Sequence, residues 1–117
     1  SEKITEAGFP IQGTTQNPFF GPIVTSSKVR EDGTVVLNIP VQPSTIAVFH
    51  AHAPEEGRIQ HPSRGDLGVV NPYTQAVIAN YLGTKNGLFV TDPSTELGYR
   101  KLREGLDWTK PCPGSAN

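Results

Sequence analysis

The sequence predicts an α+β fold: a mixed, mostly antiparallel β-sheet with one short helix after a strand that carries two histidines. Glycine and proline supply 12 and 11 of the 117 residues, and they divide the chain into short segments. Most of these segments are β-branched and apolar runs of strand length, and only one begins as a helix would. We expect a single domain over residues 1–117, with a flexible tail over 110–117.

The first half of the chain predicts one strand, one loop and one hairpin. Residues 6–11 form a short first strand, in which Pro10 indicates an edge position or an irregular end. Residues 12–21, QGTTQNPFFG, have loop composition. Two strands, at 23–29 and 34–39, flank a tight-turn signal in REDG and predict a hairpin about Asp32-Gly33.

The second half predicts a buried strand and another hairpin. Residues 45–52, TIAVFHAH, are apolar and β-branched with little alternation, which is typical of a central strand buried on both faces. The runs QAVIANYL and LFVTD flank GTKNG, where Asn86-Gly87 marks a turn.

The one predicted helix begins at Ser63. Ser63 and Asp66 have the spacing of a capping box ahead of the apolar residues in Leu67–Val70. Asn71-Pro72 ends this helix early, because a residue before proline avoids helical geometry. Residues 48–67 are therefore predicted to form the end of a strand, a loop and the start of a helix.

Composition excludes several classes of function. The formal net charge is −1 and the basic residues are scattered, so neither nucleic acid nor an anionic membrane is an expected partner. Apolar runs are too short to span a membrane. The single cysteine, Cys112, excludes an internal disulfide, and it lacks the second cysteine and the His-x-Glu of a zinc deaminase. The chain begins at Ser1 without methionine, and we expect a processed or excised piece of a longer protein.

All three histidines lie within the segment from Val48 to Leu67. Side chains alternate along a strand, so His50 and His52 share one face. Paired imidazoles suit zinc, and Asp66 at the following helix start is a candidate third ligand. The plain alternative is that His-x-His occurs without a metal and that Ser63 and Asp66 only cap a helix.

The segment HAHAPEEGRIQHPSRGD resembles the His-x-His-Pro and Ser-x-x-Asp signature of the JAMM (MPN/JAB) metalloprotease superfamily. The resemblance implies a reduced MPN/JAB-like fold in which His50, His52 and Asp66 bind Zn²⁺. It also implies that Ser63 assists at the oxyanion and that Glu6, in TEAGFPI, is the general base. The later YLGTKNGLFVTDP resembles small JAB-like domains of bacterial secreted or toxin-type proteins.

The implied function is a zinc-dependent hydrolase of peptide or isopeptide bonds, with a protein or peptide substrate. A larger parent polypeptide or a cognate partner protein is a further expected partner, and the location is either cytoplasmic or that of a secreted bacterial protein. The sequence departs from the signature, since Ala53 separates His52 from Pro54. Two alternatives stay open: a catalytically inactive MPN-like interaction module, and a toxin or effector domain with a different target.

Other residues are weaker candidates for the same chemistry. His61 precedes a proline in a polar loop and is expected to be exposed or to support the ligands. Glu55 and Glu56 form an acidic loop pair that is expected to be solvated. Glu2 and Glu31 are rivals of Glu6 for the general base, but one lies at the terminus and the other in a turn.

Overall fold

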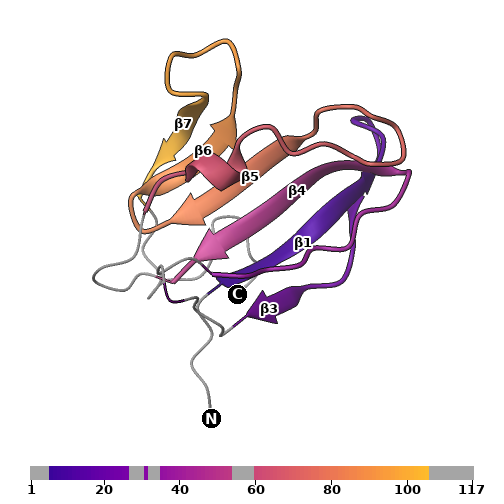
Figure 1. Cartoon of the computed structure of the whole chain (residues 1–117), viewed down its shortest axis with the longest axis horizontal. Coiled ribbons are helices and arrows are strands. Elements are labelled where there is room, and N and C mark those ends of the chain that lie inside the picture. The colour runs from indigo at the N-terminus through magenta and orange to yellow at the C-terminus, as the bar shows by residue number, and fades with distance from the viewer. Residues whose placement is uncertain (1–5, 27–30, 32–34, 54–59, 106–117) are drawn as a thin grey trace.

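A computed structural model describes residues 6–26, 31, 35–53 and 60–105 of the chain (Figure 1). Seven strands form one mixed sheet, and the described part contains no helix except a single 3-10 turn. The predicted α+β class is therefore wrong, and the fold is nearly all β. The elements are β1 (Glu6–Gly13), β2 (Pro18–Phe20), β3 (Val24–Ser26), β4 (Thr45–His52), η1 (Arg64–Asp66), β5 (Ala79–Thr84), β6 (Gly87–Thr91) and β7 (Tyr99–Glu104).

The strand order is β2-β1-β4-β5-β6-β7, and β3 also pairs with β1. Every pairing is antiparallel except that of β4 with β5, which is parallel. A parallel pair needs a long crossover, and residues 53–78 supply it. The mixed, mostly antiparallel sheet that the sequence predicts is present.

The central strand is β4, as the sequence predicts. It lies between β1 and β5, and its buried residues include Val48, His50 and His52. On the opposite face Phe49 and Ala51 are only half-buried, so the two faces of the strand are covered unequally. The histidine side is the more deeply covered one.

Strand β1 is longer than predicted, and it is not an edge strand. The segment 12–21, predicted to be loop, contributes β2, which pairs with the end of β1. Pro10 lies opposite Val48, and its carbonyl accepts a hydrogen bond from Gly21 on the side away from β4. A residue's N–H and C=O point the same way in a strand, so Pro10 removes no hydrogen bond from the β1–β4 ladder.

The predicted hairpin over 23–29 and 34–39 is wrong in the described residues. Strand β3 covers only Val24–Ser26 and pairs with Glu6–Gly8 of β1. Residues 36–44 lie outside any strand. The Asp32-Gly33 turn and the predicted tail 110–117 fall outside the described residues.

The predicted helix at Ser63 is limited to one 3-10 turn, η1. Leu67 is already extended, and Gly68 has a φ of +73°, which a right-handed helix does not accommodate. Val70 then bridges Val77 in extended pairing. The local capping signal was sound, but Gly65, Gly68 and the β-branched residues after them do not sustain a helix.

The predicted hairpin at Asn86 is confirmed. Strands β5 and β6 are antiparallel, with Thr84 opposite Gly87 across a two-residue turn. Strand β7, which the sequence reading missed, covers the outer edge of β6. Its sequence YRKLRE is largely exposed and charged, and charge on an edge strand discourages pairing with other chains.

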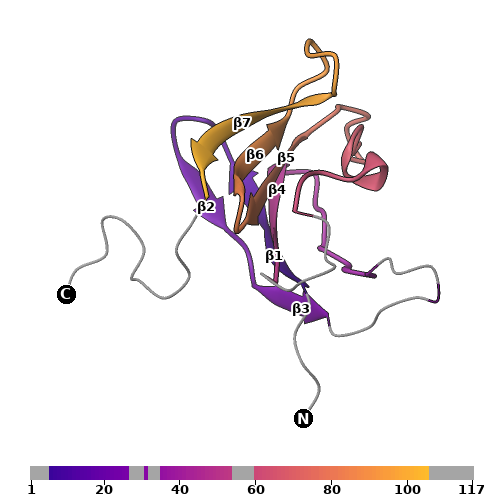
Figure 2. The same cartoon turned by 90° about the vertical axis from the view of Figure 1, so that its left-hand side faces the viewer.

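Residues 35–44 and the turn η1 lie on one side of the sheet (Figure 2). Leu37, Ile39 and Asp66 from these segments line one cleft together with His50, so they cover the face that carries this histidine. Asn71 is fully buried, and its side-chain amide donates to the carbonyls of Gln42 and Thr45. These bonds tie the crossover to the start of β4 and hold η1 over the sheet. No helix in the described residues is long and apolar enough to cross a membrane.

Candidate metal centre

The β1–β4 register places the first predicted site residues side by side. Glu6 lies opposite His52, and Gly8 lies opposite His50. A Cβ atom at Gly8 would stand 2.5 Å from the Phe49 carbonyl oxygen and 2.9 Å from the Ile39 side chain. Glycine is therefore required there chiefly because the backbone of β4 approaches closely, and the Ile39 side chain of the covering segment adds a second close contact.

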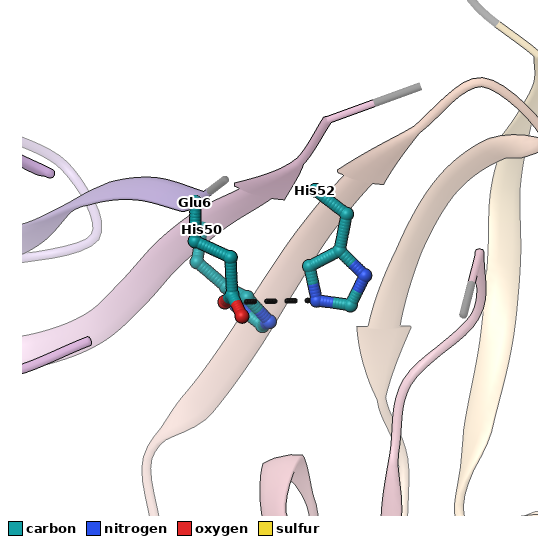
Figure 3. Close-up of side chains that lie close together, drawn as sticks. All are labelled: Glu6, His50 and His52. Atoms are coloured by element: carbon teal, nitrogen blue, oxygen red, sulfur yellow. Dashed lines mark ion pairs between the residues drawn. The ribbon is translucent and has the colours of Figure 1, made fainter. Parts of the chain in front are cut away.

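Three side chains form a compact cluster (Figure 3). Glu6, His50 and His52 each offer one ligand atom, and these atoms lie within 4.8 Å of one another. His52 Nε2 lies 3.7 Å from a Glu6 carboxylate oxygen, and the two imidazole centroids are 5.2 Å apart. Both histidines are buried, so the cluster lies inside the protein and not on its surface.

The crossover brings Asp66 to His50, but Asp66 is not one of the three residues whose ligand atoms all lie within 4.8 Å of one another. The Oδ1 atom of Asp66 lies 3.3 Å from His50 Nε2. The other carboxylate oxygen, Oδ2, accepts hydrogen bonds from the Ser63 backbone N–H at 2.8 Å and the Ser63 hydroxyl at 3.1 Å. The short turn thus fixes one oxygen of Asp66 and leaves the other facing His50.

The charges of these groups depend on one another. Burial lowers the pKa of His50, but the Asp66 carboxylate, the charge of Glu6 and the Asn80 side chain together outweigh it and raise that pKa. Burial by itself would raise the pKa of Asp66. The interaction with His50 and the two hydrogen bonds from Ser63 outweigh burial, and the pKa of Asp66 is lowered. In the metal-free protein the two groups therefore favour an imidazolium–carboxylate pair.

The donor set suits a divalent transition metal. Among the described residues, the buried Nε2 of His50 has no hydrogen-bond partner of good geometry, although it faces the Asp66 carboxylate. A buried nitrogen without such a partner is costly in a purely structural role. Two imidazoles with one or two carboxylates form a ligand set that zinc accepts.

The remaining candidates lie elsewhere. Glu31 is exposed in a turn. His61 is exposed, donates to the Pro62 carbonyl and stacks on the Tyr99 ring with centroids 6.1 Å apart. Four further candidates fall outside the described residues: Glu2, Glu55, Glu56 and Cys112.

Sequence reasoning missed Asn80. This buried residue of β5 contacts His50 through its side-chain oxygen and Asp66 through its side-chain nitrogen. A signal existed in QAVIANYL, because asparagine is depleted in strands and a buried amide needs partners. The parallel pairing of β4 with β5, which brings Asn80 opposite Val48, was not predicted.

A cleft of about 610 Å³ opens onto the centre. Its polar part includes Glu6, His50, Ser63 and Asp66. Its apolar wall comes from alternate residues of the segment that precedes β4, together with two other valines: Val35, Leu37, Ile39, Val41, Val48 and Val69. The volume is in the range of about 300–1,000 Å³ that is usual for small-molecule sites.

Comparisons with known proteins give no family for the chain: no family model matches it, and neither a curated protein nor a solved structure is significantly similar. The described residues form a β-sheet domain with a cluster of Glu6, His50 and His52, and Asp66 lies beside His50. Glu6, His50 and Asp66 also line the cleft. Any function must therefore be argued from the centre itself.

Proposed function

We propose that the chain is a zinc-dependent hydrolase of peptide or isopeptide bonds, of the JAMM type that its His-x-His and Ser-x-x-Asp segments resemble. The observation that carries the proposal is the convergence of Glu6, His50 and His52 from two strands, with Asp66 of the crossover lying against His50. Two imidazoles with a carboxylate are a ligand set that zinc accepts.

The proposed zinc ligands are His50, His52 and Asp66. Ser63 donates two hydrogen bonds to Asp66 Oδ2, and these bonds hold the carboxylate so that Oδ1 faces His50. This orientation supports Asp66 as a ligand. Glu6 is a rival ligand, since its carboxylate belongs to the 4.8 Å cluster. A bound zinc ion supplies a Lewis acid that acidifies a water and polarises the scissile carbonyl.

Glu6 is the proposed general base. Its carboxylate is half-buried at the cleft and close to both histidines, so it can reach a water molecule held beside them. It accepts the proton of the attacking water and passes it to the departing amine. The β1–β4 ladder holds Glu6 against His52, which fixes the base relative to the ligands.

Ser63 is the proposed hydrogen-bond donor to the substrate oxygen, where one such donor contributes about 3 kcal/mol to transition-state stabilisation. In the structure its hydroxyl instead donates to Asp66. This contact favours a second candidate function, a domain that holds a metal for protein interaction without turnover. A toxin or effector activity on another bond is a variant of the first candidate with the same centre.

The test is a zinc-dependent cleavage assay on a library of quenched fluorescent peptides and isopeptides. Glu6→Gln preserves size but cannot accept a proton, so turnover should fall at least about a hundredfold, which is the lower range for general base catalysis. Zinc stoichiometry and the melting temperature should stay near the wild-type values. Glu31→Gln is the matched control, because Glu31 is exposed in a turn, and it should cleave normally.

Three outcomes separate the assignments. Loss of zinc in Glu6→Gln would make Glu6 a ligand and not the base. Wild-type protein that holds zinc but cleaves nothing in the library favours the interaction domain. Wild-type protein that holds no zinc contradicts both candidate functions.

A further inference from the structure

The Asn80 side chain is polar, but it is buried within the sheet and shielded from solvent. It is 6% exposed and lies on β5, between β4 and β6. Its backbone N–H donates to the Thr91 hydroxyl at 3.0 Å, which anchors the residue to the neighbouring strand. A buried amide in this position requires partners for both of its polar atoms.

Both partners belong to the metal centre. The side-chain oxygen of Asn80 lies 2.9 Å from His50 Nδ1, and its side-chain nitrogen donates to the Asp66 backbone carbonyl at 3.0 Å. The second contact fixes the orientation of the amide, because a carbonyl can only accept and so must face the NH₂ group. The amide oxygen then faces His50, and Nδ1 of that ring must donate.

A neutral imidazole carries one N–H, so a donating Nδ1 leaves a lone pair on Nε2. Nε2 is the atom that faces the Asp66 carboxylate. The opposite tautomer would place a proton on Nε2 and hydrogen-bond it to the Asp66 carboxylate. That arrangement satisfies both groups and blocks metal binding by His50.

We infer that Asn80 is a positioning residue that holds His50 in its Nδ1–H tautomer, so that Nε2 is presented as a ligand, and that ties the turn bearing Asp66 to strand β5. The inference deepens the proposed function, since it concerns how the ligands are held. Outer-shell partners of metal-bound histidines typically change metal affinity by about 10–100-fold when they are replaced.

The first measurement uses the metal-free protein and needs no activity. Long-range ¹H–¹⁵N correlation spectra at alkaline pH report which ring nitrogen carries the proton, and the chain has only three histidines to assign. Wild-type His50 should be the Nδ1–H form. Asn80→Leu should shift it towards the Nε2–H form, whereas Asn80→Asp keeps an acceptor for Nδ1 and should restore the wild-type signal.

The second measurement is zinc affinity by competition with a chelator. Asn80→Leu should weaken binding about 10–100-fold. The matched control is Thr84→Val, which removes a fully buried hydrogen-bonding side chain from the same strand without contact to His50. It should lower the melting temperature but change neither the tautomer nor the zinc affinity by more than about threefold.

The results separate this inference from the proposed function. An Nε2–H tautomer in wild-type protein overturns the inference even if zinc binds and peptides are cleaved. The inference is also overturned if the Asn80→Leu and Thr84→Val variants bind zinc with equal affinity. A wild-type Nδ1–H ring that responds to Asn80→Leu, in a protein that cleaves nothing, supports the role of Asn80 and contradicts the hydrolase. If Asn80→Leu does not fold, the wild-type and Asn80→Asp spectra decide.

Discussion

At the residue scale, His50 and Asp66 make stability depend on pH in the metal-free protein. The raised pKa of His50 stabilises the fold below about pH 6.5, and this contribution is lost as pH rises through the folded pKa. The lowered pKa of Asp66 stabilises the fold above about pH 4, and this contribution is lost as pH falls through the folded pKa. The pair should therefore contribute most between about pH 4 and 6.5.

Thermal melts of chelator-treated protein from below pH 4 to well above pH 6.5 check the prediction, because the two contributions are lost on either side of this range. Asp66→Asn removes the charge and should flatten both limbs of the profile relative to wild type. The control is Asp92→Asn, because Asp92 pairs with Arg100 away from the centre. Hydrogen bonds from Ser94 and the Arg100 charge also lower the pKa of Asp92, so this control should change only the acid limb and leave the limb above pH 6.5 as in wild type. Parallel profiles for wild type and Asp66→Asn would show that the His50–Asp66 pair does not form.

Ser63 has two proposed roles, and Ser63→Ala separates them. The substitution removes one of the two hydrogen bonds to Asp66 Oδ2, so stability should fall by about 1 kcal/mol. The Ser63 backbone N–H still holds the carboxylate, so zinc content should be unchanged. Turnover should fall about a hundredfold if the hydroxyl also serves the substrate oxygen.

Ser94→Ala is the matched control for this substitution. The Ser94 hydroxyl and backbone N–H bind the Asp92 carboxylate in the same way, but in an exposed turn. Ser94→Ala should leave turnover intact. A Ser63→Ala protein with lowered stability and wild-type turnover would restrict Ser63 to its bond with Asp66.

At the element scale, the segment over 35–41 should determine substrate preference. Its odd-numbered residues line the cleft, whereas Asn38 and Pro40 are exposed. An extended substrate beside this wall would place apolar side chains next to the scissile bond. Ile39→Asp should therefore raise KM about tenfold for the peptides that wild type prefers, which corresponds to about 1.4 kcal/mol.

The matched control lies on the same segment. Asn38→Asp introduces the same charge at an exposed neighbour and should leave KM unchanged. Peptide cleavage with both variants measures the difference. Equal KM values for Ile39→Asp, Asn38→Asp and wild type would show that the apolar wall does not contact the substrate.

The elements that the sequence could predict are those with local signals. The apolar run of β4 and the Asn86 turn between β5 and β6 are both present in the structure. Strand β2 forms a local hairpin with β1, but it is only three exposed residues long, so its hydrophobic pattern is too short to mark it. Strand β3 is equally short, and β7 is charged, so neither stands out by hydrophobicity. The predicted helix failed for a local reason, since Gly68 takes a left-handed conformation after one turn.

At the scale of the whole molecule, the sheet assembles the centre from distant parts of the chain. Glu6 comes from the first strand, the histidines from the fourth, and Asp66 from the crossover that the parallel β4–β5 pair requires. Alternation along β4 predicted that the histidines share a face. Asn80 could not be predicted to join them, because its position depends on the β4–β5 register, which no local signal specifies.

The proposed function depends most directly on a metal ion at this centre. Anomalous diffraction at the zinc edge, from crystals grown with zinc, locates the ion without any assumption about function. We predict one strong peak at about 2.0–2.2 Å from His50 Nε2, His52 Nε2 and a carboxylate oxygen of Asp66. A zinc-soaked crystal with no peak beside His50 and His52, or with its only peak on other residues, would contradict the account.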